Sequence, residues 1–256
     1  MILTVDAGNT HIKVGAWDCE ELVFVSRLQT NPLKTQDEYA INFMEVLRLH
    51  GCNNAQFDGA IVSCVVPALS QVLTEAVQTV VRSQRVYLVG PGLKTGLNIK
   101  IDNPSTLGSD MVCAAVAAIH KYPMPCILIS LGTAPAIFAL DADGSFLGGA
   151  ITAGVGLALE ALASRTAQLP HISVEEPAQV IGTNTVSSIQ SGVVFGTADL
   201  LDGMIARMKK QLGEPCGVIA CGGLAASIVE HCSNQIQVDD YLVLEGLRQI
   251  YHKNAK

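Results

Sequence analysis

The first 18 residues predict a β-hairpin with a polar turn, and this hairpin constrains the fold more than any other stretch. Residues 2–5 are a short apolar run with β-branched side chains, and apolar residues alternate with others over residues 12–16. The turn between them reads Asp-Ala-Gly-Asn-Thr over residues 6–10. Glycine lets backbone amides approach a ligand, asparagine and threonine add donors, and an aspartate ending a buried strand can hold a metal-bound water. The turn therefore suits a nucleotide phosphate.

The same residue types also make an ordinary hairpin turn, so this stretch alone leaves both interpretations open. It is not a P-loop, because no Gly-Lys-Ser/Thr follows. It is not the dinucleotide-binding motif either, because a strand and not a helix comes next.

Charge and cysteine usage exclude several classes of partner. The chain has 256 residues, 49% of them hydrophobic, and a formal net charge of -7, which disfavours a nucleic-acid surface. Its eight cysteines form no Cys-x-x-Cys pair, so reduced core thiols are favoured over a zinc site. Neither a signal peptide nor a membrane span is evident. We predict a cytoplasmic protein with no nucleic-acid and no membrane partner.

The order of strands and helices predicts an α/β chain built from two related halves. Strands at 21–28, 60–66 and 86–89 alternate with helices at 35–50 and 69–82, which indicates a mixed sheet. An alanine-rich helix is expected at 106–120. Asp110 lies near its start, where the helix N-terminus favours the ionised form of a carboxylate. A lone aspartate at such a position often acts only as a cap or stabilises the helix dipole.

A second strand-turn-strand unit lies at residues 126–141, and its residues 129–134 align with residues 5–10. We therefore expect duplicated halves whose hairpins hold a polyphosphate in a nucleotide cleft, with domains at 1–115 and 116–256. Any two buried hairpins share glycine and threonine, so the alternative of chance similarity stays open. Downstream we expect a strand at 146–151, helices at 157–165, 186–212 and 241–251, and a strand at 218–221. Gly222 and Gly223 either seat an adenine or only make a turn.

An ordered set of motifs along the whole chain resembles the type III pantothenate kinases. The motifs are Asp6-x-Gly8-Asn9-Thr10, Gly92-x-Lys94-Thr95-Gly96-Leu97, Asp102-Asn103-Pro104, Gly108-x-Asp110, Gly132-Thr133-Ala134, Gly148-Gly149-Ala150, Thr166-Ala167-x-Leu169-Pro170, Ile181-Gly182-x-Asn184-Thr185, Gln190-Ser191-Gly192 and Gly222-Gly223-Leu224. The resemblance implies two ribonuclease-H-like domains of the actin, heat-shock ATPase and sugar kinase type, and a homodimer. It also implies transfer of the γ-phosphate of ATP to pantothenate, the first step of coenzyme A synthesis.

The resemblance also assigns roles to residues of this chain. Asp110 matches the catalytic base, acting with a magnesium ion that Asp6 holds through water. The positions that match ATP contacts are Asp6, Ala7, Gly8, Asn9, Thr10, His11, Ile12, Lys13 and Thr133. The positions that match substrate contacts are Gly108, Ser109, Asp110, Met111 and Thr185.

Three residues depart from the family pattern, and all three replace polar or charged groups. Met111 stands where an arginine would grip the pantothenate carboxylate, and a thioether cannot donate a hydrogen bond. Ser130 stands where an aspartate helps to bind potassium or ammonium, so we expect an impaired cation site. Ile101 replaces a substrate-binding tyrosine. Lys100, Arg165 or a partner subunit are candidates to replace the arginine.

These departures leave three interpretations. The first is a working pantothenate kinase, in full or weakened form. The second is an inactive relative that binds a nucleotide and serves as a regulatory or accessory protein. The third is a kinase for another small hydroxylated substrate, because Asp110 is present while the carboxylate-binding group is not.

Overall fold

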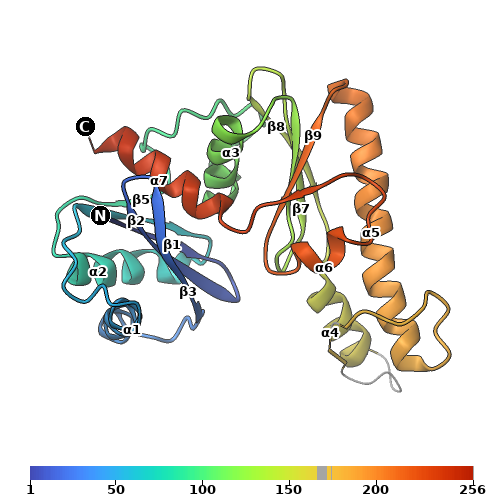
Figure 1. Ribbon diagram of the computed structural model, residues 1–256, viewed down its shortest axis with the longest axis horizontal. Coiled ribbons are helices and arrows are strands. Elements are labelled where there is room, and N and C mark those ends of the chain that lie inside the picture. The colour runs from blue at the N-terminus through green and yellow to red at the C-terminus, as the bar shows by residue number, and fades with distance from the viewer. Residues whose placement is uncertain (166–171, 174, 256) are drawn as a thin grey trace. The chain divides into compact units, whose positions relative to one another are not determined.

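Two units make up the part of the chain that the computed structural model describes, residues 1–165, 172–173 and 175–255 (Figure 1). The first unit comprises Met1–Leu97, Asp102–His120 and Tyr241–Lys256, and the second comprises Asn98–Ile101 and Lys121–Asp240. The predicted boundary between residues 115 and 116 falls inside a helix of the first unit. The C-terminal segment also returns to the first unit, which a division of the chain at a single point cannot express.

The first unit contains a five-stranded sheet in the order β3-β2-β1-β4-β5. β1 pairs antiparallel with β2 and parallel with β4, so the predicted hairpin lies in the middle of a mixed sheet. The strands are β1 (Ile2–Ala7), β2 (His11–Asp18), β3 (Glu21–Gln29), β4 (Gly59–Cys64) and β5 (Val86–Leu88). The α-helices are α1 (Gln36–Leu49), α2 (Ser70–Val81), α3 (Ser109–Lys121) and α7 (Leu242–Asn254).

Alternation along β1 assigns its side chains to two different layers. Leu3 and Val5 join the apolar core with α1 and α2. Thr4 and Asp6 point to the opposite face, where α7 packs against β1 and β4 (Figure 1). Thr4 accepts a hydrogen bond from the Trp17 indole at 3.0 Å, so its buried hydroxyl is satisfied. The second face of the sheet is therefore the more polar one, and Asp6 belongs to it.

The second unit repeats this strand order in a second sheet, β8-β7-β6-β9-β10. β6 pairs antiparallel with β7 and parallel with β9, as β1 does with β2 and β4. The strands are β6 (Cys126–Ser130), β7 (Ala136–Leu140), β8 (Phe146–Ile151), β9 (Gly217–Cys221) and β10 (Gln237–Val238). The helices are α4 (Val155–Arg165), α5 (Thr185–Leu212) and α6 (Ala225–Val229). The predicted α/β class with two related halves is confirmed.

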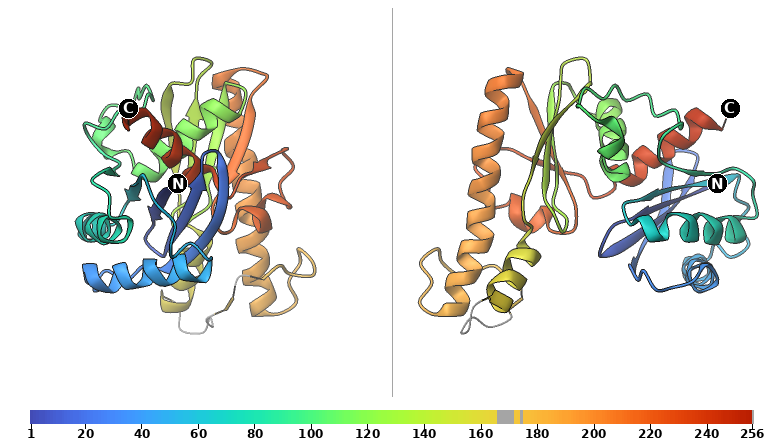
Figure 2. Two further views of the ribbon diagram at one scale, coloured as in Figure 1. Left: turned by 60° about the vertical axis from the view of Figure 1, so that its left-hand side comes forward. Right: turned by 180° about the vertical axis from the view of Figure 1, so that it is seen from behind.

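The helices of the second unit cover one face of its sheet (Figure 2). Ile127 and Ile129 of β6 pack into a core with Leu201 and Ile205 of α5.

Among the helices of the described residues, none has both the length and the apolar character of a membrane span.

The start of one predicted helix is shifted. A 3-10 helix at Pro104–Thr106 comes first, and α3 begins at Ser109 and not at residue 106. Proline is favoured at the first position of a helical turn, and the carbonyl of Gly108 then accepts the amides of Met111 and Val112. The motif at residues 166–170 lies outside the described residues.

A substitution at Gly246 tests how closely α7 packs on α3. A Cβ atom at position 246 would lie 1.9 Å from the carbonyl oxygen of Cys113. We expect Gly246→Ala to lower the free energy of unfolding by about 1–3 kcal/mol, because overpacking exceeds the gain in helix propensity. Gly203→Ala in α5 is the control, since a Cβ there meets no described atom within 4 Å, and it should be neutral or stabilising. Equal urea midpoints for the two variants would contradict the packing argument.

Candidate active site

Asp6 lies near the end of β1, between Lys13 on β2 and Ser63 on β4 in the sheet register. Its Oδ1 atom is buried and has no hydrogen-bond partner among the described residues. Burial, and to a smaller extent the charge of Asp110, raise the pKa of Asp6 to about 7, while Lys13 and a hydrogen bond from Ser63 act in the opposite direction. The sheet thus holds a carboxyl group whose charge is only partly balanced.

Asp110 is the second residue of α3 and lies close enough to Asp6 for their charges to interact. Its Oδ1 accepts the backbone N–H of Met111 at 2.8 Å, and burial raises the pKa of the carboxyl. A Cβ at Gly108 would lie 2.5 Å from the same oxygen. Glycine before the helix therefore leaves the space that the Asp110 carboxylate occupies.

A chain of hydroxyl groups connects the start of α3 to Asp6. The Ser109 Oγ accepts the backbone N–H of Cys64 at 3.1 Å and lies 3.0 Å from the Ser63 Oγ. Because Ser63 donates to Asp6, the arrangement that satisfies every group has Ser109 donating to Ser63. This network fixes α3 to β4. Ser63 was not among the predicted site residues, and its one signal in the sequence is a hydroxyl inside an otherwise apolar predicted strand.

Cys113 was also missed, and it lies one helical turn after Asp110. Its side chain is fully buried, and burial followed by the charges of Asp6 and Asp110 raises the pKa of the thiol. The thiol therefore stays protonated and forms an apolar wall beside the two carboxyl groups.

The turn after β1 is rigid at its base and open at its tip. The amide of Gly8 donates to the carbonyl of His11 at 3.0 Å, and the Thr30 hydroxyl donates to the carbonyl of Gly8 at 2.7 Å. Asn9, Thr10 and His11 are exposed. The tip of the turn is therefore accessible to solvent, and phosphate binding there stays a prediction.

The remaining predicted ATP positions of the hairpin differ in their access. Ala7 and Ile12 are fully buried in the core, so their side chains are not available to a ligand. Lys13 is half-buried opposite Asp6.

Ser130 of the second unit lies at the strand position that corresponds to Asp6. It ends β6, opposite Ala136 on β7 and Cys221 on β9. Thr133 is exposed in the following turn, and a Cβ at Gly154 would lie 2.3 Å from its carbonyl oxygen. The duplicated hairpin is present, but its end carries a hydroxyl in place of a carboxylate.

Two glycine and cap positions of the second unit also have structural explanations. Gly222 has φ +113°, and a Cβ there would lie 2.5 Å from the Leu131 carbonyl oxygen, so this turn needs glycine. At Gly223 a Cβ would meet no described atom within 4 Å. Thr185 is the exposed first residue of α5, and Asn184 is its N-cap.

The residues that we expect to depart from the family pattern lie in different parts of the fold. Met111 is 5% exposed on α3. Ile101 belongs to the second unit, where its side chain approaches Gly148. Lys100 is ion-paired with Asp141 at 2.8 Å, and Arg165 is exposed at the end of α4. The Lys100 ammonium is therefore already engaged.

Comparison with known proteins adds a family and a fold. Residues 2–207 match the family model described as type III pantothenate kinase. The type III pantothenate kinase of Geobacillus sp. (strain WCH70) is 40% identical over 255 residues, which cover 100% of this chain and 98% of the relative. That of Exiguobacterium sp. (strain ATCC BAA-1283 / AT1b) is 41% identical over 256 residues and 100% of both chains.

Two solved structures share the fold at low identity. A putative Baf family transcriptional activator from Campylobacter jejuni has a TM-score of 0.61 at 16% identity, covering 99% of this chain and 98% of that chain. The activator of 2-hydroxyisocaproyl-CoA dehydratase from Clostridium difficile, with bound ADPNP, has a TM-score of 0.57 at 12% identity, covering 98% and 94%. With its two mixed five-stranded sheets, the chain has the predicted actin-like ATPase fold.

The raised pKa of Asp6 makes stability depend on pH. In the folded chain the pKa is about 7, against about 3.9 unfolded, so the folded state binds more protons between these values and loses stability as pH rises through them. Asp6→Asn should remove this loss and, without magnesium, raise the free energy of unfolding at about pH 8 by at most about 4 kcal/mol. Urea unfolding at about pH 5 and pH 8 measures it, with exposed Asp18→Asn as control. An Asp6→Asn variant with the same pH dependence as the unaltered chain would refute the assignment.

Proposed function

We propose how this chain, which belongs to the type III pantothenate kinase family, transfers the γ-phosphate of ATP to pantothenate. The observation that carries the proposal is the pair of buried carboxyl groups of the first unit, Asp6 beside the Ser63 and Ser109 hydroxyls and Asp110 fixed by the Met111 amide. One carboxyl group has an unpaired buried oxygen, and the other lies at the start of a helix. The two groups therefore suit different tasks.

Asp110 is the proposed general base for the primary hydroxyl of pantothenate. Burial raises its pKa, so its carboxylate is a better proton acceptor than an exposed aspartate. The Met111 amide fixes one carboxylate oxygen at 2.8 Å and thereby orients the group. A positioned base of this kind contributes about 100- to 10,000-fold to the rate.

Asp6 is the proposed group that holds magnesium through water. Its buried, unpaired Oδ1 fits a metal-bound water as hydrogen-bond donor, and a carboxylate is a ligand type that Mg²⁺ prefers. Magnesium neutralises charge on the ATP phosphates. The exposed tip of the turn in the first unit, Asn9 to His11, is the proposed contact of the same phosphates.

We propose that Met111 and Ser130 distinguish this kinase from the family pattern. A thioether at Met111 offers no donor to the pantothenate carboxylate, so we propose a weak hold on that end of the substrate. The hydroxyl of Ser130, beside Ala136 and Cys221, does not fit a monovalent cation as a carboxylate would. We therefore expect a rate that does not depend on potassium or ammonium. Gly108 to Met111 are the proposed substrate contacts of the first unit.

Asp110→Asn tests the proposed base. We expect kcat for pantothenate phosphorylation to fall about 100- to 10,000-fold, because the amide cannot accept the proton, while ATP affinity is kept. A coupled assay of ADP formation with magnesium measures kcat, and calorimetry measures ATP binding. Asp37→Asn, in the first turn of α1, is the matched control. Unchanged turnover in Asp110→Asn would exclude the role, and ADP formation that ignores pantothenate would indicate another acceptor.

Met111→Arg tests the proposed weak hold on the carboxylate. A guanidinium at this position should lower KM for pantothenate about 10- to 100-fold, the value of a charge-assisted hydrogen bond. Met111→Leu, which preserves the apolar contact, should leave KM unchanged. A folded Met111→Arg protein with unaltered KM would show that the carboxylate is bound elsewhere.

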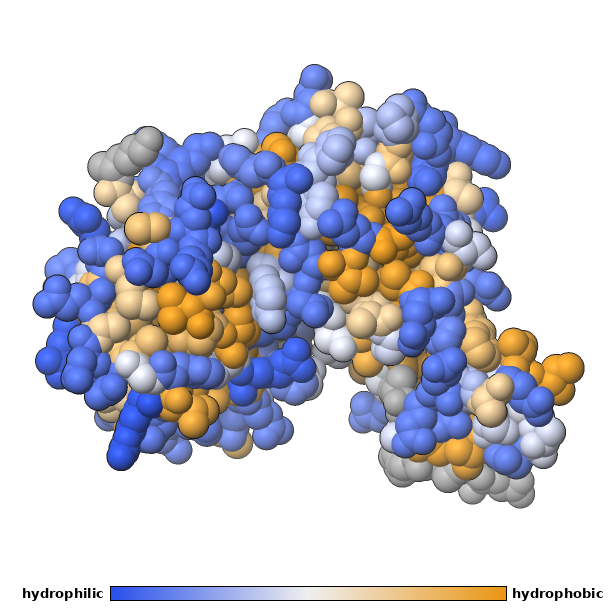
Figure 3. Space-filling model, in the orientation of Figure 1, coloured by the Kyte–Doolittle hydropathy of each residue, from blue (hydrophilic) through white to orange (hydrophobic). Residues whose placement is uncertain are grey.

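We also propose a homodimer formed through the second unit. Ile151, Val180 and Ile181 are 69%, 65% and 81% exposed, and apolar side chains project from this unit in Figure 3. Ile181→Asp should halve the mass measured by light scattering, whereas Leu33→Asp, at a 91% exposed site of the first unit, should not. A monomeric unaltered chain would refute the proposal.

A further inference from the structure

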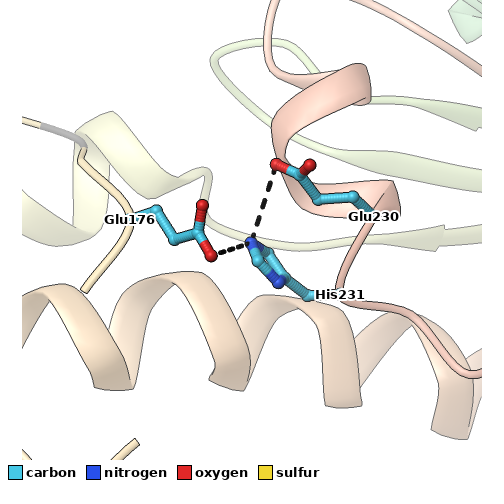
Figure 4. A group of neighbouring side chains, drawn as sticks. All are labelled: Glu176, Glu230 and His231. Carbon is cyan, nitrogen blue, oxygen red and sulfur yellow. Dashed lines mark ion pairs between the residues drawn. The ribbon is translucent and has the colours of Figure 1, made fainter. Parts of the chain in front are cut away.

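A histidine and two glutamates of the second unit converge outside the proposed active site (Figure 4). In the described part of the chain, Glu176, Glu230 and His231 place three potential ligand atoms within 4.8 Å of one another. Glu230 and His231 directly follow α6, and Glu176 lies in the segment before α5. The cluster therefore joins two segments that are distant in sequence.

The imidazole of His231 is the most constrained member of this cluster. Its side chain is 13% exposed, and the Nε2 atom is buried without a hydrogen-bond partner among the described residues. The ring packs edge-on against Phe195 of α5 at 5.1 Å between centroids, which limits its rotation. A buried polar nitrogen without a hydrogen bond is costly and calls for a ligand.

The distances within the cluster fit a bound cation better than direct hydrogen bonds. The Oε1 atoms of Glu176 and Glu230 each lie 3.8 Å from Nε2, beyond the 2.7–3.2 Å of an N–H···O bond. Tetrahedral zinc with bonds of about 2.0–2.1 Å separates its ligand atoms by about 3.4 Å, so small side-chain shifts suffice. A divalent cation also balances the two carboxylate charges that meet at this nitrogen.

The ligand chemistry and the surroundings select zinc. Imidazole nitrogen together with carboxylate oxygen suits Zn²⁺, whereas Mg²⁺ and Ca²⁺ prefer oxygen alone. Glu176 also lines a small pocket with Val194, Leu224, Ser227 and Ile228, so mostly apolar side chains border one side of the cluster. We propose that Glu176, Glu230 and His231 form a zinc site that fastens the segment before α5 to the end of α6.

Zinc titration of the full chain tests this site directly. Cys19 is the exposed cysteine, so the protein carries Cys19→Ser to remove a competing thiol and is first stripped with a chelator. Calorimetry should show one zinc ion per chain, and zinc should raise the melting temperature. Cobalt substitution should give a visible spectrum without a thiolate charge-transfer band, because the ligands are nitrogen and oxygen.

Three variants remove one ligand each while preserving size. Glu176→Gln, Glu230→Gln and His231→Phe should each weaken zinc binding by more than the roughly 10- to 100-fold that loss of an outer-shell partner costs. Glu175→Gln, the neighbouring exposed glutamate, is the matched control and should bind as before. The proposal is overturned if zinc does not bind, if the three variants bind with unchanged affinity, or if a thiolate band appears. None of these outcomes depends on kinase activity.

Discussion

Burial of a carboxyl group near the end of a central strand is the constraint on which the first unit depends. Removing Asp6 from water disfavours its charged form, and Lys13 and Ser63 offset only part of that cost. The buried Oδ1 atom has no hydrogen-bond partner among the described residues, so a donor or a cation bound there would stabilise it. Two neighbouring features limit how this oxygen can be paired. Gly108 leaves room for a second carboxylate, and the buried, protonated Cys113 thiol adds no charge beside them.

Local patterns were sufficient to predict most strands and helices and both carboxyl groups. Alternation and apolar runs located the hairpin, and Asp6 and Asp110 lie at the ends of elements whose periodicity is clear in the sequence. The positions of Ser63 and Cys113 beside Asp6 depend on contacts between segments that are distant in the sequence. Ser63 reaches Asp6 only through the register of β4 against β1, and Cys113 only through the docking of α3. No periodicity encodes either arrangement.

The same limit explains the difference in domain boundaries. The sequence of α7 is amphipathic, which predicts a helix with one buried face but not the sheet that it covers. Leu244 of α7 packs over Gly15, where its Cδ1 lies 3.1 Å from the position that a Cβ would take. The Arg248 guanidinium carbon lies 5.2 Å from the centre of the Trp17 ring. The residues that α7 contacts are therefore more than 200 positions earlier in the chain. The two sheets share one strand order yet carry different chemistry at the end of the central strand, aspartate in one and serine in the other. The strand order therefore does not determine which of the two sheets carries a carboxylate at the end of its central strand.

The return of α7 to the first sheet determines the order in which the molecule is completed during translation. β1 to β5 leave the ribosome early, but the helix that covers Thr4 and Trp17 follows residues 121–240. At 5–20 residues per second, that interval lasts roughly 6–24 s. Throughout it, the face of the nascent sheet that carries Thr4 and Trp17 lacks the helix that covers it in the finished chain. The unit whose synthesis begins first is thus also the unit that waits longest for its last helix.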